Sequence, residues 1–244
     1  MNDLLIPGSA LYQTLARYAD QLLTWNDDPV YRVSTCGSTS LLRYQGRYLA
    51  VCTWHQLKYR DLESVSLLTR DGQLCLSSEG IRHLGGGSEN EWSDIAVFDF
   101  TEPCRHHTQL KERFFEFRKI PPNAVADDTL FLVVAGYPYK DQVYELEELN
   151  HLGMVKRRLV CLLHSQPADD CLLLLKLPEA MDFDPDGLSG GTAFSVQVVD
   201  GKFQIYYAGM IMRAGGEFVY ILKSGYIRQF LDMALSQPLQ ENAS

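Results

Sequence analysis

The sequence predicts a mostly β protein in which short antiparallel strands form a barrel or a sandwich. From about residue 31, short apolar runs alternate with turn residues such as Asp71-Gly72. These runs form two sets of about six, on either side of a Pro-rich connector at residues 120–123. A helical spacing of apolar residues is clear only near the two ends of the chain. Short, evenly spaced strands of this kind are typical of antiparallel sheets rather than of alternating strand–helix units.

The first predicted element is a helix over residues 9–26. Ser9 is a suitable N-cap, because its hydroxyl can accept a hydrogen bond from a free N–H group of the first turn. Apolar residues then recur at spacings of three and four, which places them on one face: Leu11, Leu15, Tyr18 and Leu22. The polar and Pro-containing stretch at residues 26–29 ends the helix.

The strands are predicted from apolar runs bounded by turn residues. The first set comprises residues 40–44, 48–52, 64–69, 73–76 and 95–100. The second set comprises residues 129–135, 159–163, 171–176, 193–199, 204–212 and 217–222. Asp200-Gly201 predicts a tight hairpin within the second set. Residues 111–119 fit either an amphipathic helix or an irregular strand, and residues 224–234 predict a closing helix with Ser224 as N-cap.

Composition excludes some classes of function. The 244 residues include 22 Lys and Arg and 31 Asp and Glu, a net charge of −9 that argues against nucleic-acid or anionic-membrane binding. No apolar run approaches the ~18 residues of a membrane span, and the N-terminus lacks the pattern of a secretory signal. The six cysteines are scattered without a C-x-x-C pair, which favours reduced thiols in the cytoplasm.

No metal or cofactor is expected. The best metal candidate, Cys104-Arg105-His106-His107, lacks a second Cys/His cluster at a matching spacing. The Gly85-Gly86-Gly87 run is not followed by Lys and Ser or Thr, so it does not predict a phosphate-binding loop.

The most specific local signal is a serine between glycines, at residues 186–194. Glycines on both sides of Ser189 allow a sharp turn that exposes its hydroxyl. They also free backbone N–H groups, such as those of Gly187 and Ser189, to point at one spot and bind an oxyanion. Taken alone, these residues fit a Gly-rich turn that happens to contain serine equally well.

The order of residues along the chain excludes an α/β-hydrolase. In that class the catalytic histidine follows the serine, whereas all six histidines here precede Ser189. A histidine base must therefore come from upstream. His55 follows the apolar run at residues 48–52, and Asp94 precedes the run at residues 95–100, so each lies at the end of a predicted strand.

These residues resemble the chymotrypsin/trypsin-like serine protease superfamily, whose order is His, then Asp in D-[IL]-[AT], then Ser in G-x-S-G-G. The separations are 39 residues from His55 to Asp94 and 95 from Asp94 to Ser189. Gly136-Tyr137-Pro138 is similar to a G-[WFY]-[GP] segment of the family. The resemblance covers roughly residues 31–236 and is closest to bacterial-type, intracellular members without disulfides, because Gln56 and not Cys follows His55.

The resemblance implies two antiparallel six-stranded β-barrels with an N-terminal and a C-terminal helix. Residues 1–30 would form a helical extension that docks on the barrels or on another protein. Residues 31–120 would form the first barrel, with His and Asp, and residues 121–244 the second, with Ser and the closing helix.

The resemblance also implies roles for single residues. Ser189 would be the nucleophile, His55 the general base and then acid, and Asp94 the residue that orients His55. The N–H groups of Gly187 and Ser189 would form the oxyanion hole. The activity implied is hydrolysis of peptide bonds in protein or peptide substrates through an acyl-enzyme.

Substrate-binding residues follow from the same resemblance. Phe183 would lie at the base of the primary pocket and Phe218 on its wall, which favours a small or medium uncharged residue. Met212, Arg213 and Ala214 would form the strand edge that pairs with substrate. A slip of one residue would instead place Asp182 or Asp184 in the pocket and favour Lys or Arg.

One departure from the family pattern leaves regulation open. Leu188 stands where members activated by cleavage have Asp, so that activation switch is absent. The enzyme would then be active without an activation step, or a regulatory protein partner would order the oxyanion loop. A protease-like scaffold without activity is the alternative function.

Overall fold

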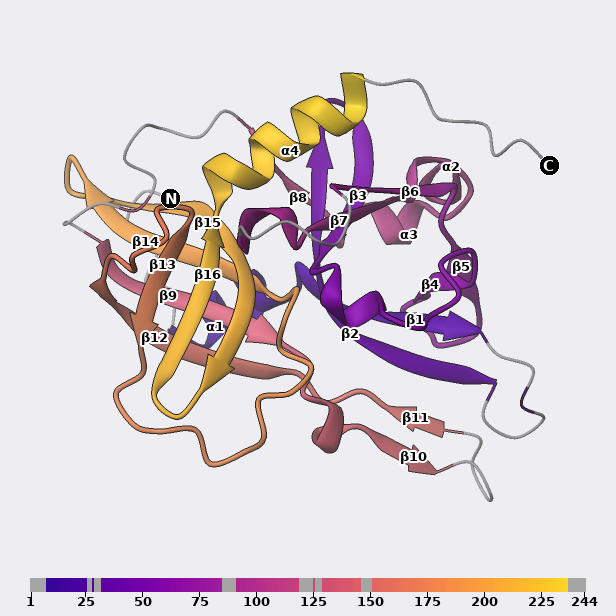
Figure 1. The fold of residues 1–244 in the computed structure, drawn as a ribbon, viewed down its shortest axis with the longest axis horizontal. Helices are drawn as coiled ribbons and strands as arrows, with labels where there is room; N and C mark the ends of the chain where they lie inside the picture. Colours follow the sequence, from indigo (N-terminus) through magenta and orange to yellow (C-terminus); the bar gives the residue numbers. More distant parts are fainter. Residues whose placement is uncertain are drawn as a thin grey trace.

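The computed structural model describes residues 8–25, 28, 32–84, 91–118, 125, 129–145 and 151–236. Its architecture is mostly β, as predicted: two β units lie side by side, and a long helix crosses above them (Figure 1). The predicted connector at residues 120–123 and the Gly85-Gly86-Gly87 run lie outside the described residues.

The predicted helix at residues 9–26 is correct in its first half and wrong in its second. Helix α1 (Gly8–Ala16) ends early, and strand β1 (Ala19–Trp25) follows it. Strand β1 pairs along its whole length with β2 (Val33–Tyr44), and all its residues except Trp25 are buried. Pairing with β2 therefore outweighs the helical spacing of the apolar residues, because local propensity is weaker than tertiary contacts. Residues 19–25 belong to the first sheet and not to a helical extension.

The first β unit is an open sheet rather than the closed six-stranded barrel that was predicted. In spatial order its strands are β5 (Cys75–Ser77), β4 (Val65–Leu68), β1, β2, β3 (Arg47–Cys52), β7 (Ala96–Asp99) and β6 (Gly80–His83). The two edge strands, β5 and β6, are consecutive in the chain and separated only by Ser78 and Glu79. The sheet therefore curls until its edges meet at a bend of the chain, and the described residues form no hydrogen-bonded ladder there.

Short helices and one short strand complete this unit. They are 3-10 helices η1 (His55–Leu57) and η2 (Glu91–Ser93), α-helices α2 (Thr101–His106) and α3 (Thr108–Lys111), and strand β8 (Phe115–Glu116). Strand β8 runs parallel to β2. The segment predicted as helix or irregular strand, residues 111–119, therefore combines the end of α3 with β8.

The second β unit is a closed six-stranded barrel, as predicted. Around the barrel its strands are β12 (Arg157–Ser165), β13 (Leu172–Lys176), β16 (Phe218–Lys223), β15 (Lys202–Gly215), β14 (Thr192–Val199) and β9 (Thr129–Gly136). The hairpin between β14 and β15 turns at Asp200 and Gly201, both with positive φ, which confirms the predicted turn.

Three further elements leave or flank the barrel. They are 3-10 helix η3 (Tyr139–Asp141), hairpin strands β10 (Val143–Glu145) and β11 (His151–Gly153), and helix α4 (Ser224–Ser236). The β10–β11 hairpin lies below the first unit, and α4 runs from the barrel across the top of the first sheet (Figure 1). Helix α4 confirms the predicted closing helix.

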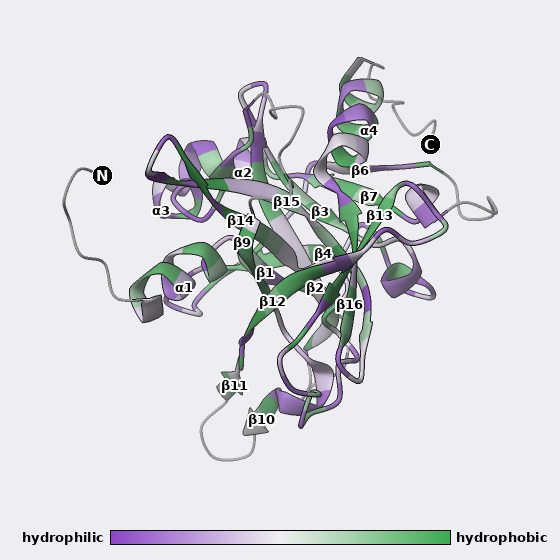
Figure 2. Ribbon diagram, turned by 90° about the vertical axis from the view of Figure 1, so that its left-hand side faces the viewer, coloured by the Kyte–Doolittle hydropathy of each residue, from purple (hydrophilic) through white to green (hydrophobic). Residues whose placement is uncertain are grey.

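Buried apolar residues fill each unit and the space between the two units. One cluster lies in the first unit around Phe98 and Phe100, and another lies in the barrel around Leu175 and Ile221. The largest cluster includes residues of both units, among them Phe194. Hydrophobic residues accordingly concentrate along the central strands, whereas the loops and the outer turns of the helices are hydrophilic (Figure 2).

Helix α1 docks on the barrel of its own chain. Tyr12 stacks edge-on against Phe131 of β9, with ring centroids 6.1 Å apart. Lys156 donates from Nζ to the carbonyl of Ala16 at 2.7 Å and to that of Ala19 at 2.6 Å. The Lys156 amine thus satisfies two carbonyl groups at and just after the end of the helix.

The six cysteines are all free, and all except Cys75 are buried. Among the helices of the described residues, none combines the length and apolar character that crossing a membrane requires.

Candidate active site

Strand pairing brings His55 and Asp94 together. His55 is the first residue of η1, shortly after β3 ends. Asp94 directly follows η2, shortly before β7 begins. Strands β3 and β7 are neighbours in the sheet. The Nδ1 atom of His55 lies 2.6 Å from Oδ2 of Asp94, and the backbone N–H of His55 donates to Oδ1 at 2.7 Å. A neutral imidazole in this arrangement carries its proton on Nδ1, which leaves Nε2 free to accept a proton.

Ser189 lies on the other β unit, in the loop that leads into β14. Its hydroxyl donates to the backbone carbonyl of Met212 at 2.8 Å and is not hydrogen-bonded to His55. The structure therefore joins two of the three predicted catalytic side chains directly. Catalytic hydrogen bonds are often absent from unliganded enzymes, and rotation about χ1 is enough to redirect a serine hydroxyl.

The chain neighbours of His55 and Ser189 nevertheless touch. Gln56 donates from Nε2 to the carbonyl of Ser38 at 2.9 Å. A Cβ atom added to Gly190 would overlap that same carbonyl and would lie 3.1 Å from Nε2 of Gln56. Gly190 also has a φ of +88°, which favours glycine. The residue after His55 and the residue after Ser189 therefore meet at the joint between the two units.

Two backbone N–H groups of the serine loop, those of Gly187 and Ser189, make no hydrogen bond among the described residues. The carbonyl of Asp186 accepts from the N–H of Tyr139 at 2.7 Å, and the carbonyl of Leu188 accepts from the N–H of Gly191 at 3.0 Å. In a trans peptide the N–H group points opposite to the carbonyl. The N–H groups of Gly187 and Ser189 thus point away from these partners, and no hydrogen bond among the described residues uses them.

The end of β15 offers an open strand edge beside Ser189. Strand β15 pairs with β14 as far as Met210, and Ile211 exchanges hydrogen bonds with Gly190 and Gly191. From Met212 to Gly215 the described residues pair with β15 only on its β16 side. An extended peptide can add to such an edge through backbone hydrogen bonds.

Arg213 connects this edge to the first unit. Its guanidinium forms an ion pair with Glu91 of η2, three residues before Asp94. It also lies over the ring of Tyr220, 4.3 Å from the centroid. Neither partner is deeply buried, so the pair contributes little to stability, but it places charged groups directly beside the strand edge.

Phe183, the predicted pocket base, is partly buried. It packs against the barrel core together with Ala214, and the guanidinium of Arg157 lies 4.7 Å from its ring centroid. The neighbouring Asp184 instead forms an ion pair with Lys140 at 2.5 Å, and that hydrogen bond holds the pKa of Asp184 below its ordinary value. Phe183 rather than Asp184 therefore packs against the barrel core in this part of the loop.

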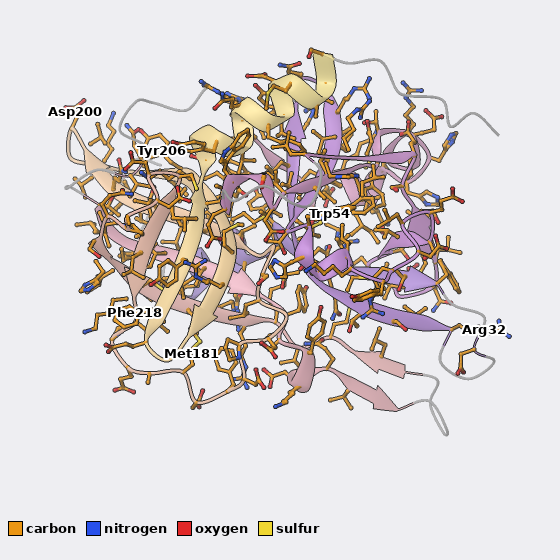
Figure 3. All side chains as sticks on the ribbon, viewed as in Figure 1. Arg32, Trp54, Met181, Asp200, Tyr206 and Phe218 are labelled. Carbon is orange, nitrogen blue, oxygen red and sulfur yellow. The ribbon has the colours of Figure 1, made fainter. Side chains whose placement is uncertain are left out.

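Phe218, the predicted pocket wall, lies elsewhere. Its ring contacts His164, near the end of β12, whereas Phe183 lies beneath Arg157 at the start of that strand. Seven residues of extended chain separate these two positions, roughly 20 Å. Figure 3 likewise shows Phe218 on the side of the barrel away from Trp54, the residue before His55.

The interior position next to Phe218 belongs to Val219. Val219 is fully buried, pairs with Ala214, and packs in the same core as Phe183. Successive side chains of a strand point to opposite faces, so an error of one residue exchanges the interior for the surface. The turn at Gly216 and Glu217 sets this register, because it pairs Gly215 with Phe218 and Ala214 with Val219.

Two other features of the site's surroundings concern titratable groups. Burial raises the pKa of the Cys52 thiol far above its ordinary value, so this cysteine near the end of β3 is not a nucleophile. Within the described ranges, no group of three or more His, Cys, Asp or Glu side chains could hold a metal ion.

Comparison with known proteins bears on the fold. No family model matches the chain, and no curated protein matches it. Among solved structures, the chain is similar to the atomic-resolution structure of HBP, a chymotrypsin-fold serine protease-like protein. The TM-score is 0.56 and the sequence identity 11%, over 92% of this chain and 94% of that chain.

The fold is chymotrypsin-like. The closed barrel, the curled first sheet and the terminal helices all correspond to this fold. A chymotrypsin-like fold supplies a protease-like scaffold.

Proposed function

We propose that the protein is a serine endopeptidase that hydrolyses peptide bonds of protein or peptide substrates through an acyl-enzyme. The observation that carries this proposal is the double hydrogen bond from His55 to Asp94, across the joint from the loop of Ser189. An imidazole held by a carboxylate, opposite a serine with unused N–H groups beside it, is the arrangement that acyl transfer needs.

In the proposed reaction, Ser189 turns from the Met212 carbonyl toward Nε2 of His55. Its Oγ attacks the substrate carbonyl carbon while the hydroxyl proton moves to Nε2, and Asp94 stabilises the resulting imidazolium. The oxyanion receives hydrogen bonds from the N–H groups of Gly187 and Ser189. The C–N bond then breaks, His55 protonates the leaving amine, and water repeats the sequence to release the acid.

The substrate is an extended peptide bound along Met212–Gly215. Phe183 and Val219 favour an uncharged residue of small or medium size before the cleaved bond, since both side chains are apolar and pack in the same core. Profiling with a peptide library tests this preference. A profile dominated by Lys and Arg would instead require Asp182 or Asp184 in the pocket and would overturn it.

The decisive experiment is labelling with a fluorophosphonate probe, which reacts with an activated serine. Wild-type protein and Ser165→Ala, which alters an exposed serine of β12, should be labelled. Ser189→Ala and His55→Ala should not be labelled. Asp94→Asn should label and cleave peptides about 10⁴-fold more slowly, as expected when the histidine adopts the wrong tautomer.

One observation favours a second candidate function, a binding scaffold without proteolysis. The Ser189 hydroxyl is hydrogen-bonded to the Met212 carbonyl and not to His55. In that case wild-type protein would resist the probe and cleave no peptide, while the edge of β15 would still bind extended peptides.

We further propose that the enzyme works in the cytoplasm, which the free thiols of its six cysteines support. Measuring the protein in cell fractions tests this location.

A further inference from the structure

A buried serine on β2 contacts the predicted oxyanion loop. Ser38 is fully buried, and its hydroxyl donates to the carbonyl of Gly187 at 2.6 Å. The same hydroxyl accepts from the N–H of Tyr137 at 2.7 Å. The backbone N–H of Ser38 also donates to the Gly187 carbonyl, at 3.1 Å. One residue of the first unit therefore supplies both donors to that carbonyl.

The far end of the loop is held by the same strand. The hydroxyl of Ser40 donates to the carbonyl of Gly190 at 3.0 Å. The carbonyl of Ser38 lies against Gly190 and accepts from Gln56, the residue after His55. Strand β2 thus holds the backbone on both sides of Ser189, and it links that backbone to the residue next to the proposed base.

This contact matters because glycine alone does not fix the loop. Gly187 has a φ of +98° and, without a side chain, can adopt many other conformations. Leu188 is apolar and 1% exposed, so it offers no charge that could hold the loop by an ion pair. The two donors of Ser38 fix the peptide plane between Gly187 and Leu188. They thereby restrict how the N–H group of Gly187 can turn.

We propose that Ser38 is a positioning residue that holds the Gly187–Gly190 loop in its catalytic shape as soon as the chain folds. The peptidase is then active as soon as it folds, and needs neither cleavage of the chain nor a regulatory partner. This inference rests on the proposed function, because it assigns the regulation of the same site.

The test compares wild-type protein with Ser38→Ala on the best peptide from library profiling. Loss of the hydroxyl should lower kcat by 10- to 100-fold, because one misdirected oxyanion donor costs about 10²–10³ in comparable sites when lost completely. KM should change less than threefold, because Met212–Gly215 and Phe183 are untouched. The matched control is Ser66→Ala, another fully buried serine whose hydroxyl donates to a backbone carbonyl, that of Ser64.

A second readout separates positioning from general destabilisation. A peptide aldehyde of the same sequence adds Ser189 Oγ to its carbonyl carbon, and the resulting oxygen occupies the oxyanion site. The corresponding peptide alcohol binds without using that site. Ser38→Ala should weaken inhibition by the aldehyde by the same factor as kcat and leave inhibition by the alcohol unchanged. If Ser38→Ala does not fold, Ser40→Ala gives the same pattern with a smaller factor.

The outcomes distinguish this inference from the proposed function. Wild-type kcat in Ser38→Ala, or an equal loss in Ser66→Ala, overturns the positioning role while the peptidase stands. Purified wild-type protein that becomes active only with cell extract overturns the claim that the protein is active without a partner. Wild-type protein that is neither labelled nor active under any condition overturns the proposed function, and the inference with it.

Discussion

Gly190 and Gly191 show how closely the backbone packs at the serine loop, against the first unit at Gly190 and within the barrel at Gly191. A side chain on Gly190 would overlap the carbonyl of Ser38, and one on Gly191 would overlap that of Ala135. The sequence indicated these glycines as a means of exposing Ser189. It could not indicate their contacts, because Ser38 lies about 150 residues away in the chain.

The catalytic candidates could be predicted from sequence because each lies in a short, recognisable pattern. His55, Asp94 and Ser189 sit at strand ends, whose positions follow from the apolar runs. Phe218 could not be placed, because the face of a strand depends on the exact register at its turn. The role of Ser38 was not predicted, since a serine within a polar strand carries no local signal.

Lys156 gives a prediction about pH. Burial lowers the pKa of Lys156 from 10.5 to about 7, with smaller effects from Arg113 and Arg158. Between these two values the unfolded chain holds a proton that the folded chain has released, so this group makes stability rise with pH. The free energy of unfolding of wild type relative to Lys156→Met should rise from pH 7 to pH 9, by at most about 1.4 kcal/mol per unit.

Urea unfolding at pH 6, 7, 8 and 9 measures this difference. Below about pH 6 the lysine is charged in both states, and the difference should be constant. Lys176→Met, which removes an exposed partner of Glu217, should show no such rise. A difference that is constant over the whole range would contradict the burial of Lys156.

At the scale of elements, β1 and β2 show where periodicity misleads. The spacing of apolar residues within the segment 9–26 fits a helix. The second half of this segment nevertheless forms strand β1, whose two faces are both covered. A doubly buried strand has no alternation of apolar and polar residues to reveal it. Strand β2 was predicted only from residue 40, because its first half is rich in small polar residues that are nevertheless buried.

Most of the remaining strands were predicted, because one face of each is apolar and turn residues bound it. All six barrel strands were found, with boundaries that differ by a few residues. Strands β6, β10 and β11 were missed, since they have only three or four residues each and lack an apolar run. The first sheet ends at the short edge strands β5 and β6, and because β6 was not predicted, the open form of the sheet was not predicted either.

Helix α4 supports a prediction about how elements join. Near its C-terminal end, Asp232 accepts from the hydroxyl of Tyr44 at 2.7 Å and from Gln45 at 3.0 Å. A double-mutant cycle with Tyr44→Phe and Asp232→Ala should give a coupling of about 1.5 kcal/mol, the low end for a hydrogen bond to a charged group. The same cycle with Tyr226→Phe, on the helix itself, should give none. Additive effects of Tyr44→Phe and Asp232→Ala would show that the contact is not energetically significant.

At the scale of the whole molecule, the two β units share one core. Phe194 of the barrel is fully buried and contacts Phe115 and Tyr18 of the N-terminal half, with ring centroids 4.9 and 5.7 Å apart. The ring of Tyr207, on β15, also packs against the ring of Phe194. We expect a cluster of this size across the joint to make the two units unfold together.

Substitution of Phe194 tests this coupling, because all three tryptophans, Trp25, Trp54 and Trp92, lie in the first unit. Phe194→Ala should lower the free energy of unfolding by about 3–5 kcal/mol. Its unfolding midpoint in urea should fall equally by tryptophan fluorescence and by circular dichroism, since both probes follow one cooperative transition.

The matched control is Phe203→Ala, which removes a side chain that is 75% exposed and should change stability by less than about 0.5 kcal/mol. A fluorescence transition that stays at the wild-type midpoint in Phe194→Ala, while the circular dichroism transition shifts, would mean that the units unfold independently.

The crowding at Gly190 and Gly191 also determines where this protein can accept substitutions and insertions. In a saturation library, variants at these two positions should disappear under selection for folded protein alone, before any activity is assayed. The hairpin tip at Asp200 lies at the opposite extreme, because it projects from the barrel far from the joint (Figure 3). A reporter domain or an affinity tag inserted there would leave the joint undisturbed.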